Sequence, residues 1–351
     1  MNSQRDQAYL KTRVGIFASR LLSDEDIRIL KQMSLHQLGE RFDLLPIFEQ
    51  EIETRQKSGL VEHQLLQQMM NELKVLLRPL SGRSRGLILY WPRKYELYNL
   101  KTLIQGKWNN LGIQEIRHNL YALPENIRLP HEALLQAENV QEMLRQLERG
   151  PYSQIAHQAR NIYEEQHENF SLGAAIDRLY YTGMLAQANI TDCSDKRGLK
   201  KAIGCMVDRQ NVLWLMRYRL VYQFAPSEVY YLLIPYGGQI QRDKLMELAN
   251  VEGLDTIVEQ LPEPFHSLLA GSAHITDARQ RLDFWVSDEL RKLMLGSRDG
   301  VVAALCYLIS RDTDIWRLYA IIQGKLLGIS AELLDEAVSG IGGPASPEEA
   351  A

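Results

Sequence analysis

Apolar residues recur at helical spacing along most of this chain. This pattern predicts one helix over Tyr9–Leu22 and another over Leu60–Leu77. Ser23 is followed by three acidic residues, as at a helix N-cap and first turn, so it predicts a further helix start. Similar starts occur at Ser287 and Ser330. No run of alternating β-branched residues or hairpin turn is present, and the pattern therefore predicts an all-α fold.

Few residues interrupt these helical stretches. Loops or turns are predicted at Pro79–Arg85, Gly150-Pro151 and Pro235–Gly238. The longest apolar run, Val301–Ile309, is far shorter than the roughly 18 to 20 apolar residues that span a bilayer, so we expect a buried helix there. The last residues, from Gly340 onward, are rich in Gly, Pro, Ala and Glu and predict a flexible tail.

The most informative pattern is an internal repeat with a period near 110 residues. Glu96–Lys107 and Asp314–Lys325 share residue classes at their first three positions, and both end in Gln-Gly-Lys. Asp208–Arg219 is a weaker third copy. The repeated polar positions are Glu96, Asn99 and Gln105, then Asp208, Asn211 and Arg217, and finally Asp314, Arg317 and Gln323. Such a period is too long for a solenoid unit and fits a small helical bundle that occurs three times.

A second match supports the same period. The segment after Leu123-Pro124 resembles the segment after Ile234-Pro235 at nearly the same offset. We therefore predict three similar helical-bundle units, over residues 1–122, 123–233 and 234–340, followed by a flexible tail over 341–351. Elements from both ends of the chain could pack together in the first unit. Three like units in sequence can close around a pseudo-threefold axis.

Two interpretations of the repeated polar positions stay open. In one, Asp208 and Arg217 are functional residues. In the other, acidic and basic or amide groups satisfy one another between helices, at equivalent joints in each unit. Recurrence in three copies favours the second interpretation, because an active site usually survives in one copy, whereas an architectural joint is needed in all.

Composition and motifs give no support for an enzyme. The 351 residues carry a formal net charge of −4, and their three cysteines have neither disulfide nor metal-ligand spacing. Gly106-Lys107 and Gly324-Lys325 lack the upstream glycine and the following Ser or Thr of a phosphate-binding loop, so we interpret them as helix ends. We expect no catalytic residue, no cofactor and no metal.

Two groups of residues are candidates for partner docking. Lys196, Arg197, Lys200 and Lys201 belong to a basic stretch that could bind an acidic partner or could be an ordinary solvated face. Tyr230, Tyr231 and Tyr236 lie near a predicted turn and could be contact points or core residues. Nucleic acid is not expected, because no pattern of base-stacking aromatic residues accompanies the basic ones.

Four segments together resemble a known family. They are Tyr9–Asp24, the stretch from Glu96 to Lys107, Asp177–Tyr181 with Asp208, Asn211 and Arg217, and Asp314–Lys325. In their order and spacing the chain resembles the C subunit of bacterial and archaeal V/A-type ATPases, also called ATP synthases, which is related to the d subunit of the eukaryotic vacuolar ATPase. Gln105 departs from the family, which often has a basic residue there. Arg317 departs from the Asn of the first two copies.

The resemblance implies a funnel-shaped, all-helical protein of three domains around a pseudo-threefold axis. It implies a non-catalytic connector in the central stalk, present in one copy, which joins the rotor shaft to the cytoplasmic loops of the membrane rotor ring. Such a connector transmits torque for ATP-driven ion transport or ATP synthesis. It has no transmembrane segment and lies in the cytoplasm, on the inner face of the cell membrane. The alternative is a helical repeat scaffold or adaptor unrelated to ATPases.

Overall fold

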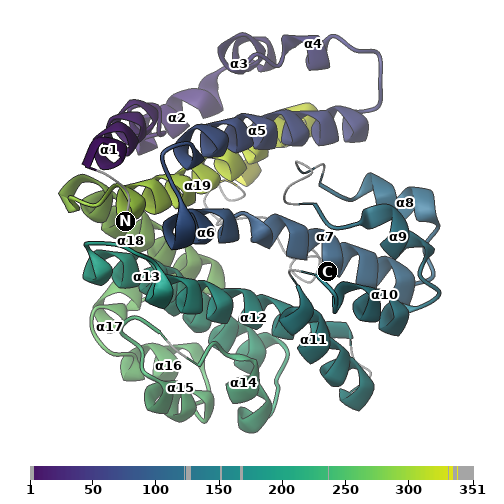
Figure 1. Ribbon diagram of the computed structural model, residues 1–351, viewed down its shortest axis with the longest axis vertical. Coiled ribbons are helices and arrows are strands. Elements are labelled where there is room, and N and C mark those ends of the chain that lie inside the picture. The colour runs from purple at the N-terminus through teal and green to yellow at the C-terminus, as the bar shows by residue number, and fades with distance from the viewer. Residues whose placement is uncertain are drawn as a thin grey trace. The chain divides into compact units, whose positions relative to one another are not determined.

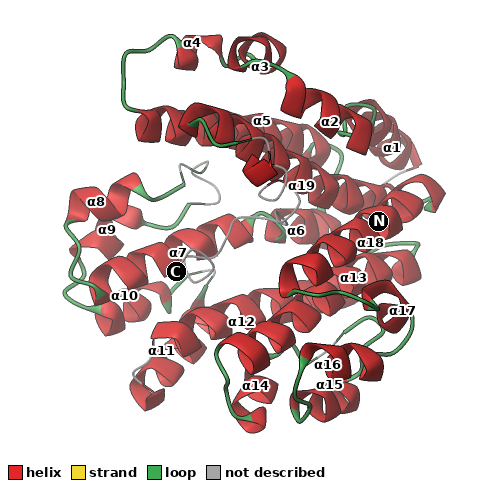
Figure 2. Cartoon of the chain, turned by 180° about the vertical axis from the view of Figure 1, so that it is seen from behind, coloured by secondary structure: helices red, strands yellow, loops and turns green. Residues whose placement is uncertain are grey.

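The regular structure of the described residues is entirely helical (Figure 2). The computed structural model describes residues 4–121, 123, 128–150, 152–166, 169–235, 237–330, 332–334 and 338. Within these ranges no strand occurs, and the predicted all-α fold is confirmed. Over the same ranges, no helix combines the length and the apolar character needed to cross a membrane.

The chain forms two compact units, each assembled from separate segments. The first unit comprises Met1–Arg85, Asp192–Ala202 and Thr276–Pro344, and the second is built on Gly86–Thr191 and Ile203–Ile275. Three helices have residues in both units: α6 (Gly82–Tyr90), α13 (Lys196–Met216) and α18 (Ile275–Gly296), of which only the first residue belongs to the second unit. The three unit boundaries expected from the repeat remain a prediction, and residues 341–351 lie outside the described residues.

A single long helix forms the core of the first unit. The helices of this unit are α1 (Gln4–Ala18), α2 (Asp24–Gln32), α3 (Leu35–Phe42), α4 (Leu45–Phe48), α5 (Thr54–Leu77), α18 (Ile275–Gly296) and α19 (Gly300–Leu327). Both α1 and α5 pack along α19 (Figure 1). Every residue from Val301 to Ile309 is buried, which confirms the buried helix predicted there. Each fully buried aliphatic side chain contributes roughly 1.5–3 kcal/mol relative to exposure.

Side-chain caps fix where several helices of this unit begin. Ser23 Oγ accepts a hydrogen bond from the Asp26 N–H, and Asp26 accepts one from the Ser23 N–H, so the predicted start at Ser23 is a complete capping box. Ser34 forms a second capping box with Gln37 ahead of α3. These bonds satisfy backbone donors that a helix start otherwise leaves free.

Two sequence predictions in this unit are wrong. Ser287 lies inside α18 and starts no helix, because Glu289 and Asp288 pair with Lys292 in the same helix and thereby fit a helix interior. The loop predicted over Pro79–Arg85 is shorter than expected, because α6 already begins at Gly82.

The second unit is a set of helical hairpins. Its helices are α7 (Arg93–Trp108), α8 (Ile113–His118), α9 (His131–Gln136), α10 (Val140–Leu147), α11 (Ser153–Gln166), α12 (Asn169–Ile190), the π-helix η2 (Arg217–Val221), α14 (Pro226–Leu232), α15 (Arg242–Ala249), α16 (Leu254–Gln260) and α17 (Phe265–Leu269). The helices α7 and α12 pack together, as do α10 with α11 and α14 with α15.

Candidate functional site

The two asparagines of the repeat make the same pair of hydrogen bonds. Asn99, in α7, donates to the Tyr121 carbonyl at 2.9 Å and accepts from the Tyr121 N–H at 2.7 Å. Asn211, in α13, donates to the Ile234 carbonyl at 3.0 Å and accepts from the Ile234 N–H at 2.8 Å. Both amides are buried, so each replaces the solvent that these backbone groups would otherwise need. We call this arrangement the asparagine clamp.

His131 adds a further contact to the first clamp. Its Nε2 lies 3.3 Å from Asn99 Nδ2. Burial lowers the pKa of His131, which favours the neutral ring, and a neutral imidazole has one nitrogen that can accept a hydrogen bond. The contact therefore fits a bond from the amide to the ring.

Asp208 binds a loop downstream of the second clamp. Its carboxylate accepts from the N–H groups of Gly238, Gln239 and Ile240 at 2.8, 2.7 and 3.3 Å. Burial raises the pKa of Asp208 to about 6, and the three N–H donors oppose this rise. The loop can approach because Gly204 and Gly238 face each other: a Cβ on Gly204 would lie 2.7 Å from Gly238 Cα.

Asp314 plays a similar part in the third copy. Its Oδ2 accepts from the Leu22 N–H at 2.8 Å, which ties α19 to the turn between α1 and α2. Burial raises the pKa of Asp314 to about 7. Arg317, which stands in the asparagine position, is half-buried, and its charge partly opposes this rise. Thus both Asp208 and Asp314 bind backbone N–H groups of another segment.

Glu96, the acid of the first copy, is also buried, and burial raises its pKa to about 8. Residues 124–127, which occupy the sequence position that corresponds to the Asp208-bound loop, lie outside the described residues. The acids of all three copies therefore share a buried setting in which the neutral form is favoured more than in water.

The residue that follows the last polar position of each copy is glycine in the first and third copies and tyrosine in the second, and the helix differs accordingly. Gln105 and Gln323 are half-buried and precede glycines, and a Cβ on Gly106 would lie 2.5 Å from Ile116 Cγ1. The glycine thus lets the following helix pack closely. In the second copy, Arg217 is followed by the buried Tyr218, and the chain forms the π-helix η2 there. The larger side chain coincides with a locally widened helix.

An ion pair that the sequence did not single out links α7 to α12. Lys101 Nζ lies 2.8 and 2.7 Å from the two carboxylate oxygens of Asp177, and the Lys101 side chain is only 8% exposed. Both residues lie in segments that carry the family resemblance, but no spacing rule relates positions 76 residues apart. The helix α7 carries other polar residues, among them Glu96 and Asn99, so a lysine in this helix does not by itself point to the pair.

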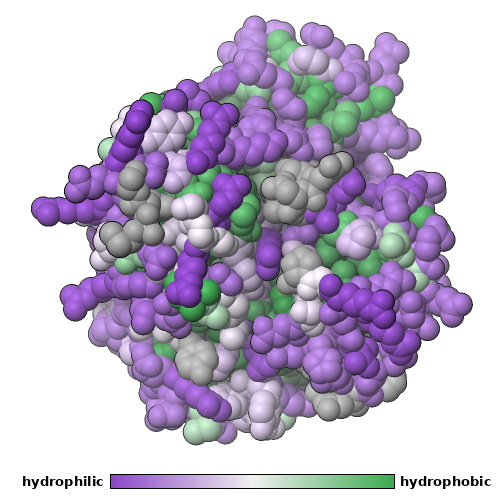
Figure 3. Space-filling model, viewed as in Figure 1, coloured by the Kyte–Doolittle hydropathy of each residue, from purple (hydrophilic) through white to green (hydrophobic). Residues whose placement is uncertain are grey.

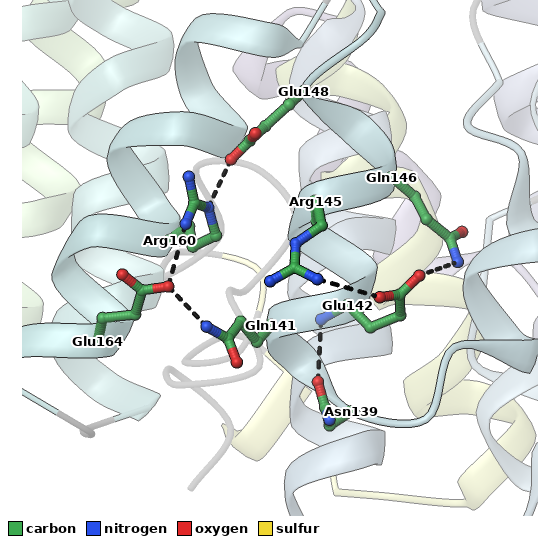
Figure 4. A network of polar contacts seen from close by, with 8 residues as sticks. All are labelled: Asn139, Gln141, Glu142, Arg145, Gln146, Glu148, Arg160 and Glu164. Atoms are coloured by element: carbon green, nitrogen blue, oxygen red, sulfur yellow. Dashed lines mark hydrogen bonds and ion pairs between the residues drawn. The ribbon is translucent and has the colours of Figure 1, made fainter.

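A second polar network joins α10 to α11 (Figure 4). Arg160 lies between Glu148 and Glu164, with nitrogen–oxygen distances of 2.5 and 3.1 Å. Gln141 donates to Glu164 at 2.7 Å, and this hydrogen bond lowers the pKa of Glu164. The network lies at the surface, where water screens ion pairs, so it orients the hairpin more than it stabilises it.

The four basic docking candidates are all exposed at the start of α13. Lys201 pairs with Glu289 of α18 at 2.5 Å, within the first unit. Tyr231 is 71% exposed, whereas Tyr230 is half-buried and accepts a hydrogen bond from Arg242. Tyr236 lies outside the described residues. Figure 3 shows that polar side chains dominate the face in view, with smaller apolar areas between them.

Comparison with known proteins gives a consistent result along almost the whole chain. Residues 10–337 match the model of the ATP synthase (C/AC39) subunit family. The C subunit of the A-type ATP synthase from Methanosarcina mazei is 24% identical over 335 residues, which cover 94% of this chain and 91% of that protein. Its counterparts from Halorubrum lacusprofundi and Haloquadratum walsbyi are 24% and 28% identical and cover 93% and 92% of this chain, with 95% of each relative matched. The resemblance inferred from the sequence is confirmed, and the chain belongs to the ATP synthase (C/AC39) subunit family.

Proposed function

We propose that this chain is the non-catalytic connector of the central stalk in a rotary V/A-type ATPase. In this role it joins the rotor shaft to the cytoplasmic loops of the membrane rotor ring, in one copy per complex. It works on the inner face of the cell membrane and passes torque between shaft and ring. Torque transfer serves ATP-driven ion transport or, in the reverse direction, ATP synthesis.

The observation that carries this proposal is the family match over residues 10–337. A match of this extent leaves little of the chain for an unrelated activity. Relatives that span almost the same length are named as C subunits of A-type ATP synthases. The alternative, a helical scaffold unrelated to ATPases, has no support in these comparisons.

The polar contacts are compatible with a part that must resist twisting. The asparagine clamps at Tyr121 and Ile234 and the carboxylate of Asp208 hold loops by their backbone, without long, flexible side chains. Backbone groups bound in this way cannot shift without breaking buried hydrogen bonds. We further propose that the three units over 1–122, 123–233 and 234–340 surround a pseudo-threefold axis and form a funnel, with the repeated polar positions as their joints.

Reconstitution of the complex with and without this chain tests the proposal. The complete complex should couple ATP hydrolysis to ion transport into vesicles. The complex without the chain should hydrolyse ATP with little or no transport, because shaft rotation no longer reaches the ring. Coupled transport of normal efficiency without the chain would overturn the connector role.

A binding experiment separates the two faces of the connector. The isolated chain should bind both the purified shaft proteins and the purified ring. We propose the exposed Tyr231 as a contact residue, so Tyr231→Ala should weaken one of these two interactions and leave the other unchanged. Failure of the wild-type chain to bind either partner would contradict the proposal.

A further inference from the structure

The start of α13 and the loop before α19 form one rigid surface in the first unit. Ser194 donates from its N–H and its Oγ to Asp299 Oδ2, each at 2.7 Å. Ser297 Oγ donates to Asp195 Oδ2 at 2.7 Å. These bonds hold residues 194–197 against residues 297–299, although the two segments are about a hundred positions apart in the sequence.

The acidic and basic side chains of these two segments have different surroundings. The acids Asp195 and Asp299 are used in the internal hydrogen bonds, and Asp299 is buried. The basic residues of the same segments are exposed, and together they define what we call the basic patch: Lys196, Arg197, Lys200 and Arg298. Asp195 and Asp299 are therefore turned inward, whereas Asp192, just ahead of these residues, is exposed.

Three cations of the basic patch have no acidic partner nearby. Within the described part of the chain, no carboxylate lies within ion-pair distance of Arg197, Lys200 or Arg298, and none of these side chains donates a hydrogen bond. Two other exposed cations of α13 and α18 have acidic partners: Lys201 pairs with Glu289 and Lys292 with Asp288. Unpaired cations held on a rigid surface attract an external anion with little cost of ordering.

One exposed apolar side chain lies close to the basic patch, and a second lies farther along the same helix. Leu295, near the end of α18, is 74% exposed and precedes Ser297 by two residues. Phe284, three turns earlier in the same helix, is 61% exposed. Clustered Lys and Arg next to a few exposed apolar side chains is the combination typical of surfaces that bind the headgroup region of a membrane.

We propose that the basic patch binds the anionic phospholipid surface of the membrane, with Leu295 in contact with the headgroup region. Clustered Lys and Arg beside an exposed apolar side chain complement the negative charge and the apolar boundary of an anionic lipid surface. The proposal goes beyond the connector role and does not depend on it. A chain that fails to couple the ATPase could still bind anionic vesicles, and the reverse also holds.

Vesicle co-sedimentation of the full-length chain tests this inference. The wild-type chain should bind vesicles of phosphatidylcholine with phosphatidylglycerol, and should bind much less to vesicles of phosphatidylcholine alone. Added salt should weaken the binding, because it screens the attraction. The triple variant Arg197→Gln, Lys200→Gln, Arg298→Gln should bind on the order of a hundredfold more weakly, since each cation near an anionic surface contributes roughly fivefold.

A variant of equal charge is the matched control. Lys74→Gln, Arg78→Gln and Arg149→Gln remove three exposed cations elsewhere, so both triple variants have a formal net charge of −7, three below the native −4. The control should bind anionic vesicles within about twofold of the wild type. Equal loss in both variants, or no binding of the wild type, would overturn the proposal. Circular dichroism of each variant verifies that it is folded.

Two further measurements distinguish lipid from protein. Leu295→Gln should weaken vesicle binding several-fold and leave its salt dependence unchanged. Binding to the rotor ring in detergent without lipid should be the same for the wild type and the basic-patch variant. A loss of ring binding confined to the basic-patch variant would overturn the lipid proposal in favour of an acidic protein surface.

Discussion

Asn211 satisfies both hydrogen-bonding groups of Ile234 with one side chain. Asn211→Ala would leave a buried N–H and a buried carbonyl without partners, and each orphaned group costs about 1–3 kcal/mol. We expect the variant to lose roughly 2–4 kcal/mol of unfolding free energy. Urea denaturation followed by circular dichroism measures this loss.

Asn250 offers a control of the same residue type. Its amide donates to the Met246 carbonyl at the exposed end of α15, where water can replace it. Asn250→Ala should therefore change the unfolding free energy by less than about 0.5 kcal/mol. Similar losses of unfolding free energy in the two variants would show that the asparagine clamp stabilises the protein no more than an exposed asparagine does.

Asp314 makes stability depend on pH. Burial raises its pKa from an ordinary 3.8 to about 7, so the native state keeps a proton that the unfolded state releases. This contribution is fully present below pH 3.8 and is lost as the pH rises through 7. The urea midpoint of the wild type should fall between about pH 4 and pH 7, and Asp314→Asn should make that fall smaller.

The exposed Asp288 tests whether any lost carboxylate has this effect. Asp288→Asn should keep the wild-type pH dependence, because its side chain is 42% exposed on α18. If Asp314→Asn and Asp288→Asn reduced the fall equally, burial would not be its cause.

At the scale of an element, the glycine in the last turn of α7 decides how closely α8 packs. Gly106→Ala would place a Cβ 2.5 Å from the buried, β-branched Ile116, which has little freedom to move. We expect a loss of roughly 1–3 kcal/mol, as for other overpacked sites. Thermal unfolding monitored by circular dichroism would show a lower midpoint.

Gly59, in the second turn of α5, is the matched control. A Cβ there meets nothing within 4 Å. Gly59→Ala should raise stability by about 0.5–1 kcal/mol, through helix propensity alone. Stabilisation by Gly106→Ala as well would show that the close packing is unimportant.

Helix positions could largely be predicted from the sequence, because periodicity and caps are local. The buried run over Val301–Ile309 and the capping box at Ser23 are examples. The start predicted at Ser287 failed because side-chain pairs within α18 replace a cap. The ion pair between Lys101 and Asp177 could not be found in advance, since it depends on how α7 and α12 pack.

The repeated polar positions likewise combine a feature that the sequence predicts with one that depends on the tertiary structure. The sequence indicated which residues recur, but it could not indicate that Asn99, Asn211 and Asp208 bind backbone groups. Almost every residue type has the same backbone N–H and carbonyl groups, so the amino-acid sequence does not identify a backbone partner. The exposure of Arg197 and Arg298 on one surface likewise depends on tertiary hydrogen bonds between two segments about a hundred positions apart in the sequence.

At the scale of the molecule, the two ends of the chain depend on each other. Gln7 accepts from the Gly300 N–H at 2.7 Å, and Leu10 and Val14 are buried in a helix that packs on α19. Deletion of residues 1–22 would expose this side of α19 and remove roughly 3–6 kcal/mol of apolar burial. We expect faster hydrogen exchange in α19, measured by mass spectrometry.

The exposed side of α1 provides the comparison. Ile16 is 44% exposed, and Ile16→Ser in the full-length chain should leave exchange in α19 unchanged. Unchanged exchange in α19 after the deletion would mean that α5 alone is sufficient to protect it.

The asparagine clamp also has a consequence for how this fold can diverge. An amide that binds a peptide group imposes nothing on the side chain of the residue it holds, and the held residue is tyrosine in one copy and isoleucine in the other. Mutations on the held side can therefore accumulate without breaking the bond, while those at the asparagine cannot. In repeats built in this way, the amino-acid sequences can therefore diverge while the hydrogen bonds stay the same.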